Sequence, residues 1–501
     1  MSKNSCPIII GVAQYTQPKD TPQPLDPLNL MVKTCQMAIA DTGTEDIKEY
    51  IDSMYMVNIN SWSYKDAPSD LSKILGINPV QKIYLSDGGD SPQMLVNRGA
   101  KAIASGQNKA IIITGGEAAY SVYREKKGKI TLNWPKRRNP KYIEKKSQSY
   151  TTNFENKYGL IYPSCTYAML ETAIRAKSGR SLKQHREHIG RIFEHYSKIA
   201  SKNPYAWSQK SYTAEEIYTP SPKNRYVIHP YTKRMCSNMF VDQSASLIMT
   251  SEETAQKLKI NPKRWIYPMG GADLKNIFNI TKRPNLYDSP AVRNASRLAL
   301  EQSGLKIEDI DLFDIYSCFP SMVQIIMNEI GLSVDDPRDF TLTGGLPYFG
   351  GPMSNYSMHT ITEAVKIIRE ISSKKIMIVA NGGYNTKQSV GIYGNKPPVI
   401  PWDERDDSEI QQSINLKSLA EPIEEAHSQI TVDAYTIYYD RDGIPLRVIV
   451  SGQLQNGRRT LALIECKPEE LLKLEEQELV GKTFPVHHDS RRDQNLISIR
   501  D

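Results

Sequence analysis

Few side chains in this sequence are of types that do covalent chemistry, and the six cysteines come first among them. None of the six belongs to a CxxC pair, and their spacing is wide and irregular. This pattern argues against a zinc site and a disulfide framework, and it fits a reducing compartment. Cys318 is the main catalytic candidate, because it ends a predicted strand and α/β folds bind ligands beyond strand ends. The alternative is a buried cysteine that only packs.

Three polar residues, Ser91, His359 and Asn381, are further candidates, and each has a plainer interpretation. Ser91 precedes Pro92 at the start of a predicted helix, which is typical of an N-cap and a first turn. No base is evident beside Ser91, so we favour capping over a nucleophilic role. His359 falls in the helix that we expect Ser354 to open, where it could orient a substrate or only bond to a neighbour. Asn381 could donate to a carbonyl group or cap a glycine turn.

The elements that carry these residues form two copies of one pattern. In each copy an amphipathic helix stops at a glycine, Gly43 or Gly304, where the missing Cβ permits a left-handed cap. A second helix later leads to a continuous apolar strand that ends in a glycine pair, KAIIITGG (109–116) or KIMIVANGG (375–383). Such strands between helices are buried on both faces, which predicts α/β layers. The glycine pairs either let backbone or ligand come close or only make turns.

Two further regions lie outside the duplication. A loop domain of about residues 120–235 is expected inside the first copy, and it begins with the basic run 124–146. That run could bind phosphates or could be a solvated loop. Near the C-terminus the hydrophobic period changes to two, and the turns Asp442-Gly443 and Asn456-Gly457 separate the predicted strands. We expect a small β-barrel there, of the oligonucleotide/oligosaccharide-binding type.

These features set the domain boundaries that we predict. Residues 1–265 form the first half, 266–400 the second half, 401–425 a linker and 426–501 the barrel. Boundaries of folding units tend to fall in exposed stretches with few contacts. We therefore expect proteolysis to cut first near 403–408, and we expect the core to stay folded without the barrel.

The chain resembles the thiolase superfamily over about residues 7–400. The resemblance rests on the ordered segments SDGGDSPQMLVNRGAKAIASG, IIITGGEAAYS, NPYAW, VDQSAS, YSCFPS, TGGLPYFGGPMSNYSMH and NGGYNTK. It is strongest to a branch near the sterol-carrier-protein thiolases, whose members are called thiolase-like proteins or acetyl-CoA acetyltransferases. The C-terminal module looks like the additional domain of type-1 members. The resemblance implies a duplicated, five-layered α-β-α-β-α thiolase core with the loop domain inserted, followed by the barrel.

The resemblance also implies which residues form the site. Thiolases use a cysteine thiolate at the N-terminus of a buried helix, and that nucleophile position falls at Gly89 here, so the sulfur is lost. The histidine of the family's GHP motif falls at Gly351, and the acid/base cysteine of its CxG motif falls at Asn381. Cys318 matches the cysteine that acts as acid/base in the HDCF type. The residues expected to contact a CoA thioester are Ser91, Gly350, Gly351, Gly382 and Gly383.

We therefore predict an acyl-CoA-binding protein of the acetyl-CoA acetyltransferase branch that does not run ordinary cysteine-based ping-pong thiolysis. Two functions stay open. One is acyl transfer without the usual covalent intermediate, with Cys318, His359 and Asn381 as catalytic groups. The other is non-catalytic binding of acyl-CoA or of a partner on the same scaffold. CoA or acyl-CoA is the expected ligand, with no covalently bound cofactor and no metal, and a homo-oligomer is left open.

The composition restricts the class of protein. With 39% hydrophobic and 24% charged residues over 501 positions, the chain is of the globular type. The net charge of +7 is mild, so a solvated lysine-rich surface explains it better than a nucleic-acid interface. No stretch approaches the ~18 apolar residues of a membrane span, and we recognise no signal peptide or targeting tripeptide. We expect a cytoplasmic protein with no membrane contact.

Overall fold

Two sheets form the core of the computed structural model, which describes residues 6–141, 143–144 and 149–498. The first sheet has the order β1-β7-β4-β2-β3 and the second has the order β8-β11-β10-β9. The strands of the first sheet are β1 (Pro7–Thr16), β2 (Ile51–Met56), β3 (Gln81–Tyr84), β4 (Ala110–Ala118) and β7 (Asp242–Ser251). The strands of the second are β8 (Tyr267–Lys275), β9 (Leu312–Ile315), β10 (Ile376–Gly382) and β11 (Lys387–Gly394).

The two sheets repeat one arrangement of strands, which confirms the predicted duplication. In the first sheet β2 and β4 are parallel, β7 is antiparallel to β4, and β1 is antiparallel to β7. In the second sheet β9, β10, β11 and β8 take the same four places with the same directions. Only β3, at the edge of the first sheet, lacks a counterpart among the described residues.

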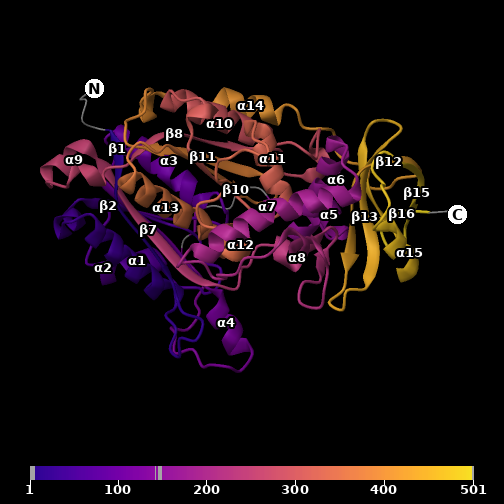
Figure 1. Cartoon of the computed structure of the whole chain (residues 1–501), viewed down its shortest axis with the longest axis horizontal. Helices are drawn as coiled ribbons and strands as arrows, with labels where there is room; N and C mark the ends of the chain where they lie inside the picture. The colour runs from indigo at the N-terminus through magenta and orange to yellow at the C-terminus, as the bar shows by residue number, and fades with distance from the viewer. Residues whose placement is uncertain (1–5, 142, 145–148, 499–501) are drawn as a thin grey trace.

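Helices form three layers around the two sheets (Figure 1). The helices α1 and α2 pack on the first sheet, α10 and α11 pack on the second, and α3 and α13 lie between the sheets in contact with both. Their bounds are α1 (Pro27–Asp41), α2 (Ala67–Leu75), α3 (Ser91–Ala104), α10 (Pro290–Ser303), α11 (Pro320–Ile330) and α13 (Tyr356–Glu370). The predicted α-β-α-β-α layering is confirmed. Gly43 and Gly304, at φ +85° and +69°, end α1 and α10 as expected.

Two predicted helix starts are wrong. The N-cap of α3 is Asp90, and Ser91 is the first helical residue, so Ser91 is not the cap. Pro92 is then the second helical residue, which the first turn tolerates because its amide would be unpaired there. The second error concerns Ser354, which lies within a 3₁₀ turn, η6 (Met353–Asn355), that precedes α13.

Helices are the main regular elements of the inserted region. It comprises α4 (Ala119–Lys126), α5 (Asn153–Lys157), α6 (Pro163–Ser178), α7 (Leu182–Lys202), α8 (Ala214–Tyr218), β5 (Tyr226–Ile228), β6 (Tyr231–Thr232) and η2 (Lys233–Met235). The remaining short elements of the core are η1 (Glu45–Glu49), α9 (Glu252–Lys257), η3 (Pro262–Arg264), η4 (Ile280–Lys282), η5 (Ile307–Asp309) and α12 (Gly345–Tyr348).

The C-terminal domain is a sheet whose five strands close on themselves at the right-hand end of Figure 1. Around the ring the order is β12-β13-β14-β16-β15, and β15 and β13 both pair with β12. The elements are β12 (Ser428–Tyr439), β13 (Pro445–Leu454), β14 (Arg459–Ile464), α15 (Pro468–Leu474), β15 (Thr483–Asp489) and β16 (Gln494–Ile497). A small β domain is therefore present. Its assignment to the oligonucleotide/oligosaccharide-binding type stays a prediction.

The stretch that joins core and C-terminal domain is packed, contrary to our expectation of few contacts. It contains η7 (Trp402–Glu404) and α14 (Ser408–Asn415), which contacts α10. The buried Trp402 indole donates to Pro268 O at 2.8 Å. The Arg405 guanidinium donates to Gln302 Oε1 at 2.8 Å and pairs with Asp407 at 2.8 Å. Prolines and charges at 395–409 resemble a linker, yet these side chains bind the core.

Candidate functional site

A cavity of about 1310 Å³ lies where the two halves and the insertion meet. Five of the residues singled out from the sequence line it: Gly89, Gly351, Gly383, Cys318 and Asn381. The other four, Ser91, Gly350, Gly382 and His359, lie outside its lining. Segments far apart in the chain thus come together at one place, because the loops after β3, β9 and β10 all leave their sheets at this side.

A tyrosine occupies the place of a side chain at Gly89, the position where the sequence predicts a lost nucleophile. A Cβ atom added at Gly89 would overlap the hydroxyl oxygen of Tyr316 and would lie 2.6 Å from Asn381 O. Tyr316 lines the cavity, and burial raises the pKa of its phenol well above the usual value. A protonated hydroxyl group therefore occupies the place of a side chain at Gly89. Sequence reasoning singled out Gly89 and missed the tyrosine, although Tyr316 stands two residues before Cys318.

Neighbouring polar groups also occupy the side-chain places of two other glycines, Gly351 and Gly382. A Cβ at Gly351 would overlap the Ser237 hydroxyl, and a Cβ at Gly382 would overlap the Asp90 carboxylate. Asp90 Oδ1 lies 3.5 Å from Lys387 Nζ in a nearly buried ion pair without a well-directed hydrogen bond. Close approach to another part of the protein thus explains why no side chain is tolerated at these positions.

Cys318 lies between β9 and α11 and lines the cavity. The residue is only 9% exposed, and burial raises the pKa of the thiol to about 12. The thiol is therefore protonated at neutral pH, and a proton donor suits it better than a nucleophile. A second cavity cysteine, Cys236, has its pKa raised to about 12 by burial as well. We had not singled out Cys236 from the sequence.

The Asn381 amide is held on both sides. Its nitrogen donates to Tyr167 Oη at 2.8 Å and lies 3.9 Å from Cys318 Sγ, while its oxygen accepts from Gln388 Nε2 at 2.9 Å. Tyr167 also lines the cavity and donates to Gly383 O at 2.9 Å. The amide is thus fixed beside the thiol, and its hydrogen bonds are already made within the protein.

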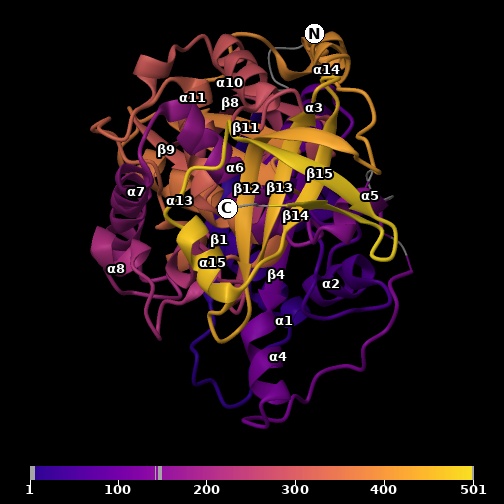
Figure 2. The same cartoon turned by 90° about the vertical axis from the view of Figure 1, so that its right-hand side faces the viewer.

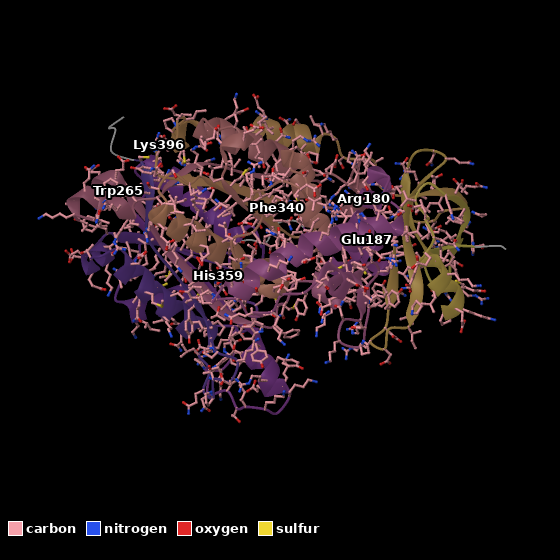
Figure 3. All side chains as sticks on the ribbon, viewed as in Figure 1. Arg180, Glu187, Trp265, Phe340, His359 and Lys396 are labelled. Carbon is pink, nitrogen blue, oxygen red and sulfur yellow. The ribbon has the colours of Figure 1, made fainter. Side chains whose placement is uncertain are left out.

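His359 is a core histidine (Figure 3). Its side chain is fully buried, Nδ1 lies 3.0 Å from Gln14 Oε1, and the ring packs against Phe349. Burial lowers the pKa of His359 to about 3, so the ring is neutral at physiological pH. The structure does not bring this residue to the cavity. His359 follows the segment GGPMSNYS in the sequence, which suggested a place near the site. The helix α13 instead directs its side chain toward Gln14 on β1 of the first sheet.

Four basic side chains line part of the cavity, and we call them the basic wall. They come from the second part of the insertion, and they are Lys210, Lys223, Lys233 and Arg234. Among its described residues, the run 124–146 contributes no lysine or arginine to the lining. Arg137 from this run instead lies over the Trp62 ring at 3.9 Å, and its Nη2 donates to Ser61 O at 2.9 Å. Residues 142 and 145–148, which lie in or next to this run, are outside the described part of the chain.

Aromatic and apolar side chains surround the mouth of the cavity. Tyr123 and Phe240 pack with ring centroids 5.2 Å apart, and Tyr120 and Trp207 pack at 5.0 Å. Phe240 is half exposed, as is its neighbour Met239. An apolar rim beside a basic wall suits a ligand with both apolar and anionic parts.

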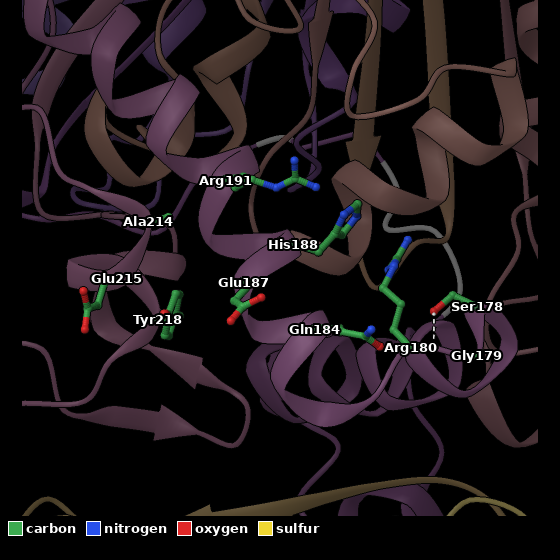
Figure 4. A pocket seen from close by; sticks show the side chains of 10 residues that line it. All are labelled: Ser178, Gly179, Arg180, Gln184, Glu187, His188, Arg191, Ala214, Glu215 and Tyr218. Carbon is green, nitrogen blue, oxygen red and sulfur yellow. Dashed lines mark hydrogen bonds between the residues drawn. The ribbon is translucent and has the colours of Figure 1, made fainter.

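A second hollow, of about 770 Å³, lies on the surface between α6, α7 and α8 (Figure 4). Arg180 and Arg191 share it with Glu187 and Glu215, so its charges are mixed. Its neighbour His185 bonds to Glu171 at 2.6 Å within the core. This hollow contains none of the residues singled out from the sequence, and the main cavity is therefore the candidate site.

Two negative findings apply to the described residues only. Within residues 6–141, 143–144 and 149–498, no group of three or more histidine, cysteine or acidic side chains could hold a metal ion. Within the same ranges, no helix has both the length and the apolar character needed to cross a membrane.

Comparison with known proteins identifies the family. A monomeric SCP2-thiolase-like protein type 1 from Mycobacterium smegmatis, solved by crystallography, is 30% identical and matches 100% of both chains with a TM-score of 0.85. Residues 409–491 match the family described as thiolase-like protein type 1 additional C-terminal domain. The chain belongs to the SCP2-thiolase-like protein type 1 family. The predicted resemblance, including the type-1 C-terminal module, is confirmed.

More distant matches include a sterol carrier protein, an acetyltransferase and a thiolase. Bovine sterol carrier protein 2 is 26% identical over 243 residues, which are 45% of this chain and 40% of that protein. An acetyl-CoA acetyltransferase from Methanocaldococcus jannaschii is 22% identical and covers 60% of this chain and 70% of its own. Human mitochondrial 3-ketoacyl-CoA thiolase, solved with CoA, shares the fold at 16% identity, with 77% and 98% of the chains covered and a TM-score of 0.54.

Proposed function

We propose that this SCP2-thiolase-like protein binds a CoA thioester in the main cavity and transfers its acyl group without forming an acyl-enzyme. The residues that line this cavity support the proposal. A protonated tyrosine stands where the nucleophile would be, a protonated thiol and an amide stand beside it, and basic side chains form one wall. Relatives named as an acetyl-CoA acetyltransferase and as a thiolase solved with CoA fit this ligand class.

The phosphates of CoA would lie against the basic wall. Lysine and arginine bind phosphate groups by charge-assisted hydrogen bonds, and arginine does so with two parallel donors. From that wall the pantetheine arm would pass Gly351 and Gly383, which line the cavity, and reach Cys318 and Gly89. The apolar rim around Phe240 would then contact the acyl group or the adenine.

The reacting end of the cavity offers neutral proton donors in place of a nucleophile. An acceptor attacks the thioester carbonyl carbon directly, and the bond between that carbon and the CoA sulfur breaks. The Cys318 thiol gives its proton to the departing sulfur and regains a proton from the acceptor. The Tyr316 hydroxyl donates to the carbonyl oxygen as negative charge develops there. Asn381 fixes the Cys318 thiol in place, since its own hydrogen bonds are made within the protein.

A second candidate function is binding of acyl-CoA without catalysis. It is favoured by the pKa of about 12 at both Cys318 and Cys236, which leaves almost no thiolate at neutral pH. It is also favoured by the lack of any side chain at position 89. In this case the cavity would hold the thioester and leave it unchanged.

Calorimetry with CoA, pantetheine and an acyl-CoA, together with an assay for released CoA thiol, tests both candidates. Exchanging Lys233 and Arg234 for alanine should weaken CoA binding by about tenfold or more and leave pantetheine binding unchanged, because only the phosphates contact the wall. The matched control exchanges Lys136 and Arg138, which are exposed and outside the cavity lining.

The outcomes separate the candidates. Release of CoA in the presence of an acyl acceptor, lost in Cys318→Ala and without an acylated protein by intact mass, supports acyl transfer. Tight acyl-CoA binding with no release supports the non-catalytic candidate. Absence of CoA binding by the unaltered protein contradicts both.

A further inference from the structure

The C-terminal domain is joined to the wall of the main cavity by paired strands. Tyr438 on β12 pairs with Ile228 on β5, so the C-terminal sheet continues into the insertion. The His229 amide donates to Ile437 O at 3.0 Å. The buried Thr436 hydroxyl donates to His229 O at 2.7 Å. Nothing in the sequence pattern indicated this pairing, because more than 200 residues separate the two strands.

The hairpin that β12 holds carries much of the basic wall. Lys223 precedes β5, and Lys233 and Arg234 follow β6 in the turn η2. Hydrogen bonds tie the hairpin to that turn: the backbone amide of Lys233 donates to Arg225 O at 3.0 Å. The Arg234 amide likewise donates to the side chain of buried Asn224, also at 3.0 Å.

Aromatic contact strengthens the junction between hairpin and domain. The Tyr226 ring on β5 stacks on the Tyr439 ring at the end of β12, with centroids 5.1 Å apart. Stacked aromatic pairs of this kind add to strand pairing. Figure 2 shows the face of the C-terminal sheet, with α6 lying behind it.

The helix α6 forms a second link of the same kind. The buried hydroxyl of Thr172 accepts from Tyr435 N at 3.0 Å and donates to Tyr435 O at 2.8 Å. The first turn of α6 lines the cavity through Pro163 and Ser164. Four buried residues of the C-terminal domain belong to the same apolar cluster as α6, and they are Ala434, Ile449, Leu461 and Leu463.

We infer that the C-terminal domain is a positioning element of the ligand site, which sets the place of the basic wall through the β12–β5 junction. The inference rests on the proposed function, because it concerns the phosphate-bearing part of the same CoA ligand. Residues on β12 contact no ligand in this arrangement and act through the hairpin. The domain thereby determines affinity for CoA phosphates, while the reacting end around Cys318 is supported by the core sheets.

The test uses the full chain and compares two threonines on one strand. Thr436→Val removes the hydroxyl that bonds to the hairpin and keeps the size of the side chain. The control, Thr431→Val, makes the same change on β12 where the hydroxyl is exposed and bonds to Thr483 at 2.9 Å, away from the hairpin. Tyr226→Leu, which removes the ring stack from the hairpin side, is the second variant in case Thr436→Val fails to fold.

The expected result is selective. Thr436→Val and Tyr226→Leu should each weaken CoA binding by about three- to tenfold, the range of one lost buried hydrogen bond or ring contact. Pantetheine binding should stay within twofold of the unaltered protein, and Thr431→Val should behave like the unaltered protein. Hydrogen exchange of the 223–236 peptide should become faster in the first two variants only.

Three results would overturn the inference. One is unchanged CoA affinity in both variants; another is an equal loss for CoA and pantetheine, which indicates general distortion. A third is unchanged exchange of the hairpin peptide, which shows that β12 does not hold it. A failure of the proposed function looks different, because the unaltered protein itself would then bind no CoA.

Discussion

At the scale of single residues, the Tyr316 hydroxyl prevents a simple return of the nucleophile. Gly89→Cys should place its Cβ against that hydroxyl and 2.6 Å from Asn381 O, so we expect a loss of about 1–3 kcal/mol in the free energy of unfolding. We also expect no acylated protein after incubation with acetyl-CoA. Urea unfolding and intact-mass spectrometry measure the two effects.

A double-mutant cycle provides the control for this clash. If overlap with Tyr316 causes the loss, Gly89→Cys should cost less stability in a Tyr316→Ala background than in the unaltered protein. Additive losses would show that the tyrosine is not the obstacle. Formation of a stable acyl-cysteine in the single variant would contradict the steric argument altogether.

The raised pKa of Cys318 makes a prediction about pH. Burial disfavours the thiolate, so below a pKa of about 12 the reactive fraction grows tenfold for each pH unit. Alkylation of Cys318 by iodoacetamide should therefore accelerate steadily between pH 7 and pH 10, and bound CoA should slow it. Peptide mass spectrometry resolves the sites.

Two other cysteines calibrate that measurement. Half-buried Cys466 should react without protection by CoA, and fully buried Cys35, which is outside the cavity lining, should stay unmodified. A plateau of the Cys318 rate below pH 9 would mean that the thiol has a lower pKa than its burial implies. The proton-donor role would then have to be given up.

Sequence reasoning located the cavity better than it assigned roles within it. Motif order brought Gly89, Gly351, Cys318 and Asn381 to one site, because strand ends in an α/β fold converge. The tyrosine at the nucleophile position is a contact between segments more than 200 residues apart, and no local pattern reports such a contact. His359 went to the core because helix direction, which periodicity leaves undetermined, decides where its ring points.

At the scale of elements, the junction at 401–408 should resist proteases. We expect Arg405→Ala to increase cleavage there by about tenfold, because hydrogen bonds to a charged group are lost from a segment that opens locally. Exposed Arg441 on the β12–β13 loop gives the matched control, and Arg441→Ala should leave the cleavage at 401–408 unchanged. Rapid cutting of the unaltered chain at 403–408 would restore the view of this stretch as a free linker.

Helices and strands were predicted well wherever one hydrophobic period extends over the whole element. The duplicated strand–helix pattern, the glycine caps at Gly43 and Gly304, and the change to alternation in the C-terminal module all follow from local side-chain spacing. The start of α3 was missed by one residue, since proline is tolerated at several positions of a first turn. The start of α13 was missed by two residues, because the 3₁₀ turn η6 comes before the helix.

At the scale of the whole molecule, the chain ending at Arg405 should be insoluble. Removal of the C-terminal domain would expose the face of α6 that packs with Ala434, Ile449, Leu461 and Leu463. Large exposed apolar patches promote association. Soluble yield and circular dichroism measure the result, and co-expression of residues 406–501 should restore solubility. A soluble, folded and CoA-binding core would instead support the appended, independent domain that the sequence suggested.

The pairing of β5 with β12 determines when the site can form during synthesis of the chain. A ribosome makes Ile228 about 210 residues before it makes Tyr438, which pairs with it. At about 5–20 residues per second, the hairpin waits roughly 10–40 s for its neighbouring strand. The five-stranded ring closes later still, because β16 is made after the other four strands of the ring and lies between β14 and β15. The basic wall is therefore fixed only after β12 has been made, and a chain that stops before Tyr438 carries a core without a finished site.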